Sequence, residues 1–505
     1  MHVDKRIRHA GLAAKVMTAA KAAELVDHGM TIGMSGFTGA GYPKAVPEAL
    51  AARMVATHER GDPFRVRVLT GASTAPELDG ALARADGIDL RLPYQSDPEL
   101  RARINRGEMD YLDIHLSHVA QYAWFGFFGK IDLAVIEATA IMPDGSLLAS
   151  SSVGNNKTWI DLAEKVIVEV NHWQPLELDG MHDIYYGTAL PPHRKPIPLL
   201  KPDDRIGEPY LRLDPDKVIA VVETNAPDRN SAFAPPDETS RQIAGNLIEF
   251  FRHEIAKGRL GPQLLPLQSG VGNIANAVLA GLREGGFRGL SAYTEVIQDG
   301  MLDLLENDVL SVASATSFSL SPAGIERFLA KLDFFRKRII LRTQEISNHP
   351  ELVRRLGCIA MNGMVEADLY GNINSTHVAG TSIINGIGGS GDFARNGFLS
   401  CFLTPSTAKN GAVSCIVPMV SHVDHTEHDV AVIVTEQGLA DLRGLSPRQR
   451  AKVVIERCAH PSYRPMLQDY FDRAMHDSRG KHTPHLLQEA LSWHQRFLDT
   501  GDMRP

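Results

Sequence analysis

One stretch of the chain, residues 264–297, decides the fold class. It begins with an apolar run, passes through a glycine-rich loop into a helical run, and ends in a second apolar run: Leu264-Leu265-Pro266-Leu267, Gln268-Ser269-Gly270-Val271-Gly272-Asn273, Ala277-Val278-Leu279-Ala280-Gly281-Leu282 and Leu290-Ser291-Ala292-Tyr293-Thr294-Glu295-Val296-Ile297. Short apolar runs rich in β-branched and aromatic residues predict strands. Strand, helix and strand in this order indicate an α/β fold with a largely parallel sheet.

The same alternation continues through the chain. Further strands are predicted at Val66–Thr70, Leu133–Ile136, Lys165–Val170, Val218–Val222 and Val430–Val434. Asp237 is placed to cap a helix that carries apolar residues at Ile243, Leu247, Phe251 and Ile255. Thr483-Pro484 predicts the start of another helix, over Leu486–Leu498.

A weak internal repeat suggests two similar α/β domains. Ser35-Gly36 is echoed by Ser269-Gly270, and Val68-Leu69-Thr70 by Ala292-Tyr293-Thr294. After the matched threonines the first half has Gly71 and the second has Glu295. A polar, turn-rich connector over 224–236 favours a boundary there, giving an N-terminal domain 1–228 and a C-terminal domain 229–505.

Composition excludes several classes of protein. Lys and Arg number 52 and Asp and Glu 60, so the net charge of −8 argues against a surface that grips nucleic acid or anionic lipid. No apolar run approaches the roughly 20 residues that span a bilayer, and no signal peptide is evident. Four cysteines in 505 residues are too few for a disulfide scaffold. We expect a soluble cytoplasmic protein with reduced thiols.

Two glycine motifs leave alternatives open. Gly270–Ala275 fits G-x-G-x-x-A and Gly386–Gly391 fits G-x-G-x-x-G. Such loops bring backbone N–H groups to a dinucleotide or to another anionic or carbonyl ligand, but they also form plain tight turns. The cluster of His422, Asp424, His425 and His428 fits a polar loop better than a metal site, so no metal is expected.

Glu295 ends a β-rich apolar run, where a carboxylate is costly unless it is solvated or hydrogen-bonded. The carboxyl ends of parallel strands are also where α/β proteins bind ligands. From the residues alone, a solvent-facing side chain is the simpler interpretation.

A larger set of motifs resembles one family. These are Gln268–Asn273, Tyr293–Gly300, Gly386–Ala394 and Val434–Gly444, with the early Ser35–Pro43 and the late Lys481–His485. Together they are similar to the acetyl-CoA hydrolase/transferase family of class I CoA-transferases, over nearly the whole chain. Within it, the resemblance is closest to the succinyl-CoA:acetate branch found in acetic acid bacteria.

The resemblance implies a fold of two similar α/β domains of the NagB/RpiA/CoA-transferase type. It implies that Glu295 is the nucleophile, and that Asn348, Gly389 and Glu436 complete the catalytic set. It also implies residues that bind CoA or the substrate, which are Gly270, Val271, Gly272, Asn273, Ile274, Val365, Asn385, Gly389, Lys409 and Arg229. Coenzyme A is a substrate in this family, so the resemblance implies no cofactor. The resemblance also implies a homodimer.

Each implied role has a simpler alternative. Gly389 could serve only a turn, Asn348 could only cap the helix after Pro350, and Lys409 could be solvated surface. Arg229 could only pair with Asp228 or Asp237. The expected function is transfer of CoA from succinyl-CoA to acetate through a glutamyl-CoA thioester with ping-pong kinetics. An acyl-CoA hydrolase on the same scaffold, and a non-catalytic regulator that binds CoA or a dinucleotide, stay open.

Overall fold

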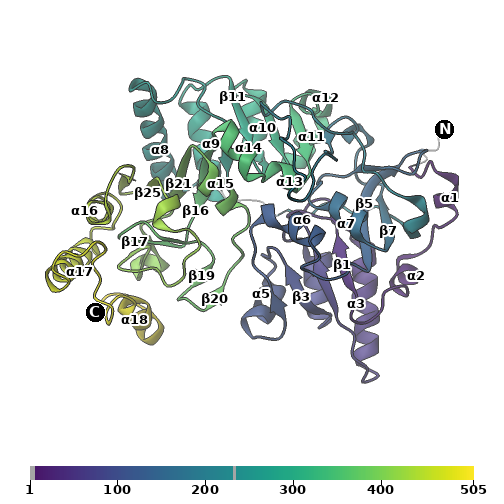
Figure 1. The fold of residues 1–505 in the computed structure, drawn as a ribbon, viewed down its shortest axis with the longest axis horizontal. Helices are drawn as coiled ribbons and strands as arrows, with labels where there is room; N and C mark the ends of the chain where they lie inside the picture. Colours follow the sequence, from purple (N-terminus) through teal and green to yellow (C-terminus); the bar gives the residue numbers. More distant parts are fainter. Residues whose placement is uncertain (1–5, 231–234) are drawn as a thin grey trace. The chain divides into compact units, whose positions relative to one another are not determined.

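The computed structural model describes residues 6–230 and 235–505 and confirms the predicted α/β class (Figure 1). The chain divides into two compact units. Unit 1 contains 6–230 with 292–305 and 311–356, and unit 2 contains 235–291 with 306–310 and 357–505. In the part of the chain that is described, no helix combines the length and hydropathy needed to cross a bilayer.

The first large sheet belongs to unit 1 and has the order β4-β3-β2-β1-β5-β7-β9, with β6 paired to β5. Every neighbouring pair on that path is parallel, whereas β6 is antiparallel to β5. The strands are β1 (Thr31–Met34), β2 (Val66–Leu69), β3 (Ile88–Leu92), β4 (Asp110–Tyr111), β5 (Leu133–Ile141), β6 (Leu147–Ala149), β7 (Lys165–Asn171) and β9 (Val218–Thr224).

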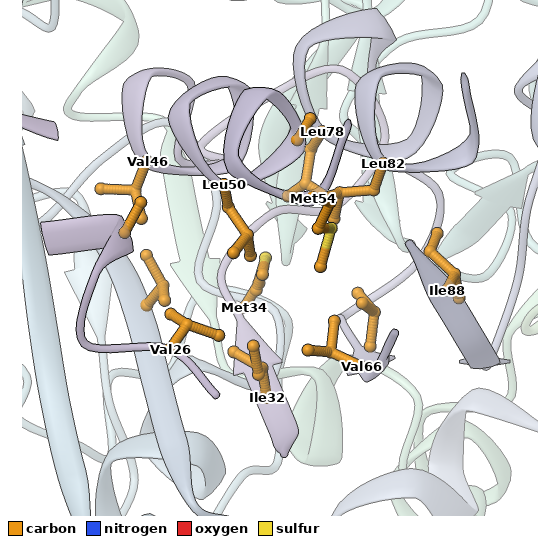
Figure 2. Packing of buried hydrophobic residues seen from close by; sticks show 14 of the residues in the cluster. Val26, Ile32, Met34, Val46, Leu50, Met54, Val66, Leu78, Leu82 and Ile88 are labelled. Carbon is orange, nitrogen blue, oxygen red and sulfur yellow. The ribbon is translucent and has the colours of Figure 1, made fainter. Parts of the chain in front are cut away.

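Helices cover this sheet and bury its apolar strands. All nine residues of β5 are buried, as expected for a parallel strand covered on both faces. Figure 2 shows one of the resulting layers: Leu50 and Met54 of α3 (Ala45–His58) point at Ile32 and Met34 of β1. Leu78 of the helical turn Pro76–Gly80 belongs to the same apolar cluster.

The second large sheet has nine strands in the order β26-β25-β21-β16-β10-β11-β13-β15-β8. The pairs β10–β16, β16–β21, β21–β25, β13–β15 and β15–β8 are parallel, and β26 is antiparallel to β25. The strands are β8 (His182–Asp183), β10 (Leu267–Ser269), β11 (Leu290–Tyr293), β13 (Leu310–Ala315), β15 (Ile339–Arg342), β16 (Ile359–Gly363), β21 (Leu399–Leu403), β25 (Val432–Thr435) and β26 (Gly438–Asp441).

The two sheets repeat one topology. Numbered in chain order, the main strands of the first sheet lie in the order 4-3-2-1-5-6-7, and β15-β13-β11-β10-β16-β21-β25 follow the same order. β10 therefore corresponds to β1 and β11 to β2. Gly71 follows β2 and Glu295 follows β11, so the faint sequence repeat marks equivalent strand ends.

Short strands and the remaining helices complete the fold. The short pairings are β12 (Val296–Gln298) with β14 (Ser317–Ser319), β17 (Glu366–Asp368) with β18 (Ile373–Asn374) and β24 (Ile416–Val417), β19 (His377–Val378) with β20 (Ser382–Ile383), and β22 (Thr407–Ala408) with β23 (Val413–Ser414). The longer helices include α6 (Leu116–Trp124), α7 (Asn156–Leu162), α8 (Glu238–Ala256), α9 (Asn273–Glu284), α10 (Asp299–Glu306), α11 (Pro322–Ala330), α14 (Pro350–Leu356), α15 (Ser390–Asn396), α16 (Pro447–Arg457), α17 (Arg464–Asp477) and α18 (Ser492–Thr500).

One predicted helix is confirmed and one begins later than predicted. The side chain of Asp237 caps α8 by accepting a hydrogen bond from the Ser240 N–H at 2.8 Å. The predicted start at Thr483-Pro484 is wrong, because α18 begins at Ser492. Tyrosine hydroxyls hold the intervening backbone: Tyr370 donates to the Pro484 carbonyl, and Tyr470 accepts from the Leu486 N–H at 3.2 Å.

The four cysteines, Cys358, Cys401, Cys415 and Cys458, are buried and unbridged, as expected. Burial raises the pKa of Cys358 to about 12, so this thiol stays protonated at neutral pH. These thiols are structural rather than reactive.

Candidate active site

Glu295 lies in the turn between β11 and β12, at the carboxyl end of β11. Its carbonyl oxygen accepts hydrogen bonds from the N–H groups of Thr316 at 2.9 Å and Ser317 at 3.2 Å. β12 then leaves the line of β11 and pairs in parallel with β14. The backbone of the turn is therefore fixed on both sides of a half-buried carboxylate.

Asn348 contacts this carboxylate directly. Its Nδ2 donates a hydrogen bond to Oε1 of Glu295 at 2.7 Å, and its side chain is fully buried. The hydroxyl of Ser347 lies 2.8 Å from Oδ1 of Asn348 and donates to it. Because Oδ1 is occupied in this way, the amide presents its NH₂ group to Glu295.

The side chain of Asn348 thus points at Glu295 rather than capping the helix that starts at Pro350. Asn348 itself ends the short helix α13 (Gln344–Ser347). The sequence identified Asn348 as a candidate but not the adjacent Ser347. A hydroxyl next to the amide was the one feature of the sequence that could have indicated the role of Ser347.

Unit 1 braces α13 from several directions. The hydroxyl of Tyr293, at the end of β11, donates to the carbonyl of Ile346. The Gln344 N–H donates to the Gly154 carbonyl at 2.9 Å, and Gln344 Nε2 donates to the Leu116 carbonyl at 3.1 Å. The amide and the carboxylate therefore sit on elements that are bonded to each other, which is the preorganisation that electrostatic catalysis requires.

Arg229 also belongs to unit 1, and it pairs with neither Asp228 nor Asp237, the partners in the simpler alternative. Its guanidinium forms an ion pair with Glu77, and its backbone N–H donates to Gly39 at 2.9 Å. Asp228 is occupied elsewhere, because it accepts from the Lys44 ammonium at 3.0 Å. The Arg229 side chain is 61% exposed, so a ligand carboxylate could reach it.

In unit 2 the loop Gly270-Val271-Gly272 joins β10 to α9, as predicted. Gly272 has a φ of 131°, a conformation that favours glycine, and it precedes Asn273 and Ile274 in the first turn of α9. Val271 is 48% exposed. The Gly270 N–H is used within the sheet, where it donates to Met361 at 2.9 Å, so the loop's donors for a ligand begin at Val271.

Gly389 occupies the equivalent place before α15, where its carbonyl accepts from the Phe393 N–H at 3.2 Å. Asn385 lies in the preceding loop, and its Oδ1 is buried without a hydrogen-bond partner among the described residues. Val365 follows β16, and its N–H donates to Asn374 at 2.8 Å.

Glu436 lies in the turn between β25 and β26. Its carboxylate accepts from the Ser406 N–H at 2.8 Å and from Gln437 Nε2 at 2.9 Å. Burial acts to raise its pKa, but the hydrogen bonds from Ser406 and Gln437 outweigh it, and the pKa lies below its ordinary value. This carboxylate is ionised and held in place at neutral pH.

Lys409 is exposed and has a positive φ of 49°. Its ammonium lies 5.6 Å from the ring centroid of Phe497, at cation–π distance. The exposure agrees with the simple alternative of a solvated lysine, while the fixed ring contact gives the ammonium a defined position. An exposed ammonium in a defined position is suited to pairing with an anionic ligand.

The histidine-rich loop does not gather its polar groups around a common point. Asp424 accepts from the Ser375 N–H at 2.6 Å, His425 bonds to the Ser390 hydroxyl at 3.1 Å, and His428 is 81% exposed. Within residues 6–230 and 235–505, no cluster of three or more His, Cys, Asp and Glu side chains has a geometry suited to a metal ion.

Comparison with known proteins assigns the family. Two family models match, the acetyl-CoA hydrolase/transferase N-terminal domain over residues 1–223 and its C-terminal domain over 324–471. The chain belongs to the acetyl-CoA hydrolase/transferase family. Relatives at 48–51% identity over nearly the whole chain are named as CoA-transferases, so an enzyme is favoured over the non-catalytic regulator.

Relatives in this family carry two kinds of name. A succinyl-CoA:acetate CoA-transferase of Clostridium kluyveri is 51% identical over 99% of this chain and 92% of its own length. A propanoyl-CoA:succinate CoA transferase of Escherichia coli is 48% identical over 96% and 98%. An acetyl-CoA hydrolase of Schizosaccharomyces pombe is 46% identical over 99% and 98%.

Solved structures share the fold at much lower identity. RipA of Yersinia pestis is 22% identical, with a TM-score of 0.71 over 92% of this chain and 99% of its own. A 4-hydroxybutyrate CoA-transferase of Porphyromonas gingivalis is 20% identical, with a TM-score of 0.62 over 91% and 98%. At such identities the likeness establishes the fold alone.

Proposed function

We propose that the protein is a CoA-transferase that moves CoA from succinyl-CoA to acetate and releases acetyl-CoA and succinate. The observation that carries this proposal is the hydrogen bond from Asn348 Nδ2 to Glu295 Oε1 at 2.7 Å. It pairs a candidate nucleophile with a donor already aimed at the oxygen on which negative charge would develop. The 51% identical relative named for this reaction supports the choice of substrates.

The chemistry is covalent catalysis by a carboxylate. Glu295 attacks the thioester carbonyl of succinyl-CoA, and the C–S bond breaks to give a succinyl-glutamyl anhydride and the CoA thiolate. The thiolate then attacks the glutamyl carbonyl, which forms a glutamyl-CoA thioester and releases succinate. Acetate attacks this thioester to give an acetyl-glutamyl anhydride and thiolate, and the thiolate takes the acetyl group and restores the Glu295 carboxylate.

Asn348 has a defined part in this sequence. When a nucleophile adds to the glutamyl carbonyl, the oxygen that accepts from Nδ2 becomes a full oxyanion. A preorganised donor at such an oxygen contributes about 3–4 kcal/mol to the transition state. The N–H of Gly389 is proposed as the donor for the oxyanion of the acyl carbonyl, and Glu436 as polar support for the site.

The other site residues are proposed to bind the substrates. The loop Gly270-Val271-Gly272 with Asn273 and Ile274 would line the CoA chain, together with Val365 and Asn385. Lys409 would meet CoA phosphates, because an exposed ammonium pairs well with phosphate oxygens. Arg229 would receive the free carboxylate of the substrate.

A hydrolase is the second candidate, and the acetyl-CoA hydrolases among the relatives favour it. In that reaction water instead of acetate would resolve the glutamyl thioester. If the chain were the non-catalytic regulator, replacing Glu295 would leave its function intact.

We also propose a cytoplasmic homodimer acting in acetate metabolism, where succinate formation from succinyl-CoA would link it to the citric acid cycle.

One experiment tests the nucleophile and the acceptor together. The purified protein is incubated with succinyl-CoA, with and without acetate, and the products are separated by chromatography. A second portion is treated with borohydride and analysed by mass spectrometry. Acetyl-CoA that forms only with acetate, and a modification confined to Glu295, are expected. Thiol release without acetate would favour the hydrolase, and modification at another residue would overturn the mechanism.

A further inference from the structure

Unit 1 contains a large cavity that the proposed reaction does not use. Its volume is about 850 Å³, within the range of roughly 300–1,000 Å³ that is typical of small-molecule sites. The walls come from α6, from the segment 188–197 and from the start of α14. Glu295, Asn348 and Arg229 are not among the lining residues.

One face of α6 forms a wall of this cavity. Ser117, Gln121 and Trp124 are spaced by four and three residues, so they share a face of the helix, and all three line the cavity. Trp124 is 38% exposed, an unusual state for a large aromatic side chain. An indole on a cavity wall offers a flat surface for stacking a planar ring.

The remaining lining residues carry an excess of positive charge. The acidic lining residues are neutralised: Glu351 pairs with Arg355 at 2.7 Å, and Glu345 pairs with Lys157 at 3.1 Å. Arg194 instead contacts neutral groups, namely the side-chain oxygen of Gln121 and the carbonyl of Ala189.

Lys195 follows Arg194 on the exposed rim, and within the described ranges no carboxylate lies at ion-pair distance from either residue. Two uncompensated cations beside an aromatic wall suit a ligand that is both anionic and planar.

The cavity lining also includes His349, which is neutral at pH 7. Burial lowers the pKa of His349 to about 4, and the charge of Arg194 acts in the same direction. Its Nδ1 is buried without a hydrogen-bond partner among the described residues. His349 lines the cavity, but Nδ1 itself has almost no accessible surface, so no ligand contact is assigned to that atom.

We propose that this cavity binds a nucleoside phosphate, with the phosphate on Arg194 and Lys195, the base on Trp124 and His349 as a further lining residue. The shared chemistry is a planar ring that carries an anionic group. An aromatic carboxylate is a second source of that chemistry. Inorganic phosphate and acetate lack the ring and would bind weakly.

The cavity is also connected to the catalytic centre through the segment 345–349, and this connection rests on the proposed function. Glu345 and His349 line the cavity, whereas Asn348, between them in the chain, points at Glu295. A ligand that moves His349 therefore acts on the neighbouring amide through one peptide bond. We expect nucleotide binding to change kcat more than KM, because Asn348 serves the transition state.

Binding is tested by calorimetry on the full chain with ADP, benzoate and inorganic phosphate as separate probes. Wild type should bind ADP saturably with one site per chain and bind phosphate far more weakly. The double variant R194A/K195A should bind ADP at least about tenfold more weakly, because each cation supplies a charge-assisted contact. The charge-matched control K165A/K201A, two exposed lysines outside the cavity, should bind like wild type.

Other outcomes separate the alternatives. W124L should weaken ADP and benzoate but leave phosphate unchanged, and benzoate binding without ADP binding would assign the site to aromatic carboxylates. Equal ADP affinity in wild type and R194A/K195A, or displacement of ADP by CoA in both with the same constant, would overturn the proposal. These titrations need no turnover, so they remain decisive even if Glu295 proves not to be the nucleophile.

Discussion

The amide nitrogen Nδ2 of Asn348 lies 2.7 Å from Oε1 of Glu295 and donates a hydrogen bond to it. An amide donor in that position leaves the ground-state carboxylate intact and gains strength as negative charge concentrates on the accepting oxygen. In the proposed mechanism, the contact stabilises the transition state more than the resting enzyme, which is the condition for raising kcat. Three predictions start from this contact and its surroundings, and a fourth concerns a buried carboxylate of unit 2.

Replacing Glu295 should abolish turnover without unfolding the protein. In Glu295→Gln the side chain keeps its size, but an amide cannot form the anhydride. We expect kcat to fall by at least about a thousandfold. Steady-state assays with succinyl-CoA and acetate measure the loss, and circular dichroism with thermal unfolding checks the fold. Activity retained within a few fold would show that Glu295 is not the nucleophile.

Removing the amide of Asn348 should slow the chemical steps. Asn348→Ala deletes the oxyanion donor, and we expect kcat to fall about 10²–10³-fold, with a small change in KM for the acyl-CoA. Asn348→Asp should be worse, because a second carboxylate would repel Glu295. If Asn348→Ala lost affinity for succinyl-CoA and kept kcat, the side chain would be a binding residue only.

Ser347 should act by holding the amide in its orientation. Its hydroxyl lies 2.8 Å from Oδ1 of Asn348, so Ser347→Ala frees the amide to rotate. The lost hydrogen bond is worth about 1 kcal/mol, which corresponds to a decrease in kcat of roughly fivefold. Ser347→Thr keeps the hydroxyl and should restore kcat. Equal kcat for Ser347→Ala and wild type would show that packing alone orients Asn348.

Acid should weaken unit 2 through a buried carboxylate. The hydrogen bond from Arg259 holds the pKa of Glu254 at about 2, and Arg443 adds a second bond at 3.0 Å. Because the folded pKa lies below the unfolded value of about 4.3, this pair stabilises the fold above that pH. The stabilisation should be lost as the pH falls through the folded value.

Chemical unfolding followed at pH 5, 4 and 3 measures this loss. Glu254→Gln should flatten the pH dependence of the free energy of unfolding over that range. Glu456→Gln, an exposed carboxylate in the same unit, should leave the slope as in wild type. Parallel slopes for all three proteins would mean that other groups control the acid response.

Much of the fold was predictable from local patterns. Val66–Leu69 and Val218–Thr224 are strands, as expected for apolar β-branched runs that are buried in a parallel sheet between helices. The helix that Asp237 caps was predictable, because helix capping depends on residues next to the start of the helix. The start of α18 was not predictable, because tyrosine hydroxyls from distant segments hold residues 484–486 outside a helix. Long-range contacts of this kind leave no local signal.

The candidate site was predictable only in part for the same reason. Residue types and spacing singled out Glu295, but on their own they favoured a solvent-facing side chain. The hydrogen bond to Asn348, 53 residues further along the chain, depends on how α13 is braced. For Arg229, the simpler alternative of a pair with Asp228 or Asp237 does not hold, because Asp228 is taken by Lys44 and the partner Glu77 comes from a distant turn.

The equivalent strand ends at Gly71 and Glu295 differ in the room that each leaves for a side chain. A Cβ built on Gly71 would lie 2.8 Å from the Gly36 carbonyl oxygen and 3.1 Å from Oε1 of Gln344. The Gly36 backbone and the Gln344 side chain therefore fill the space in which a carboxylate would stand in the first half. A side chain at residue 71 would therefore press on Gln344 of α13, the short helix that Asn348 ends. Grafting a glutamate onto residue 71 would damage the existing centre rather than create a second one.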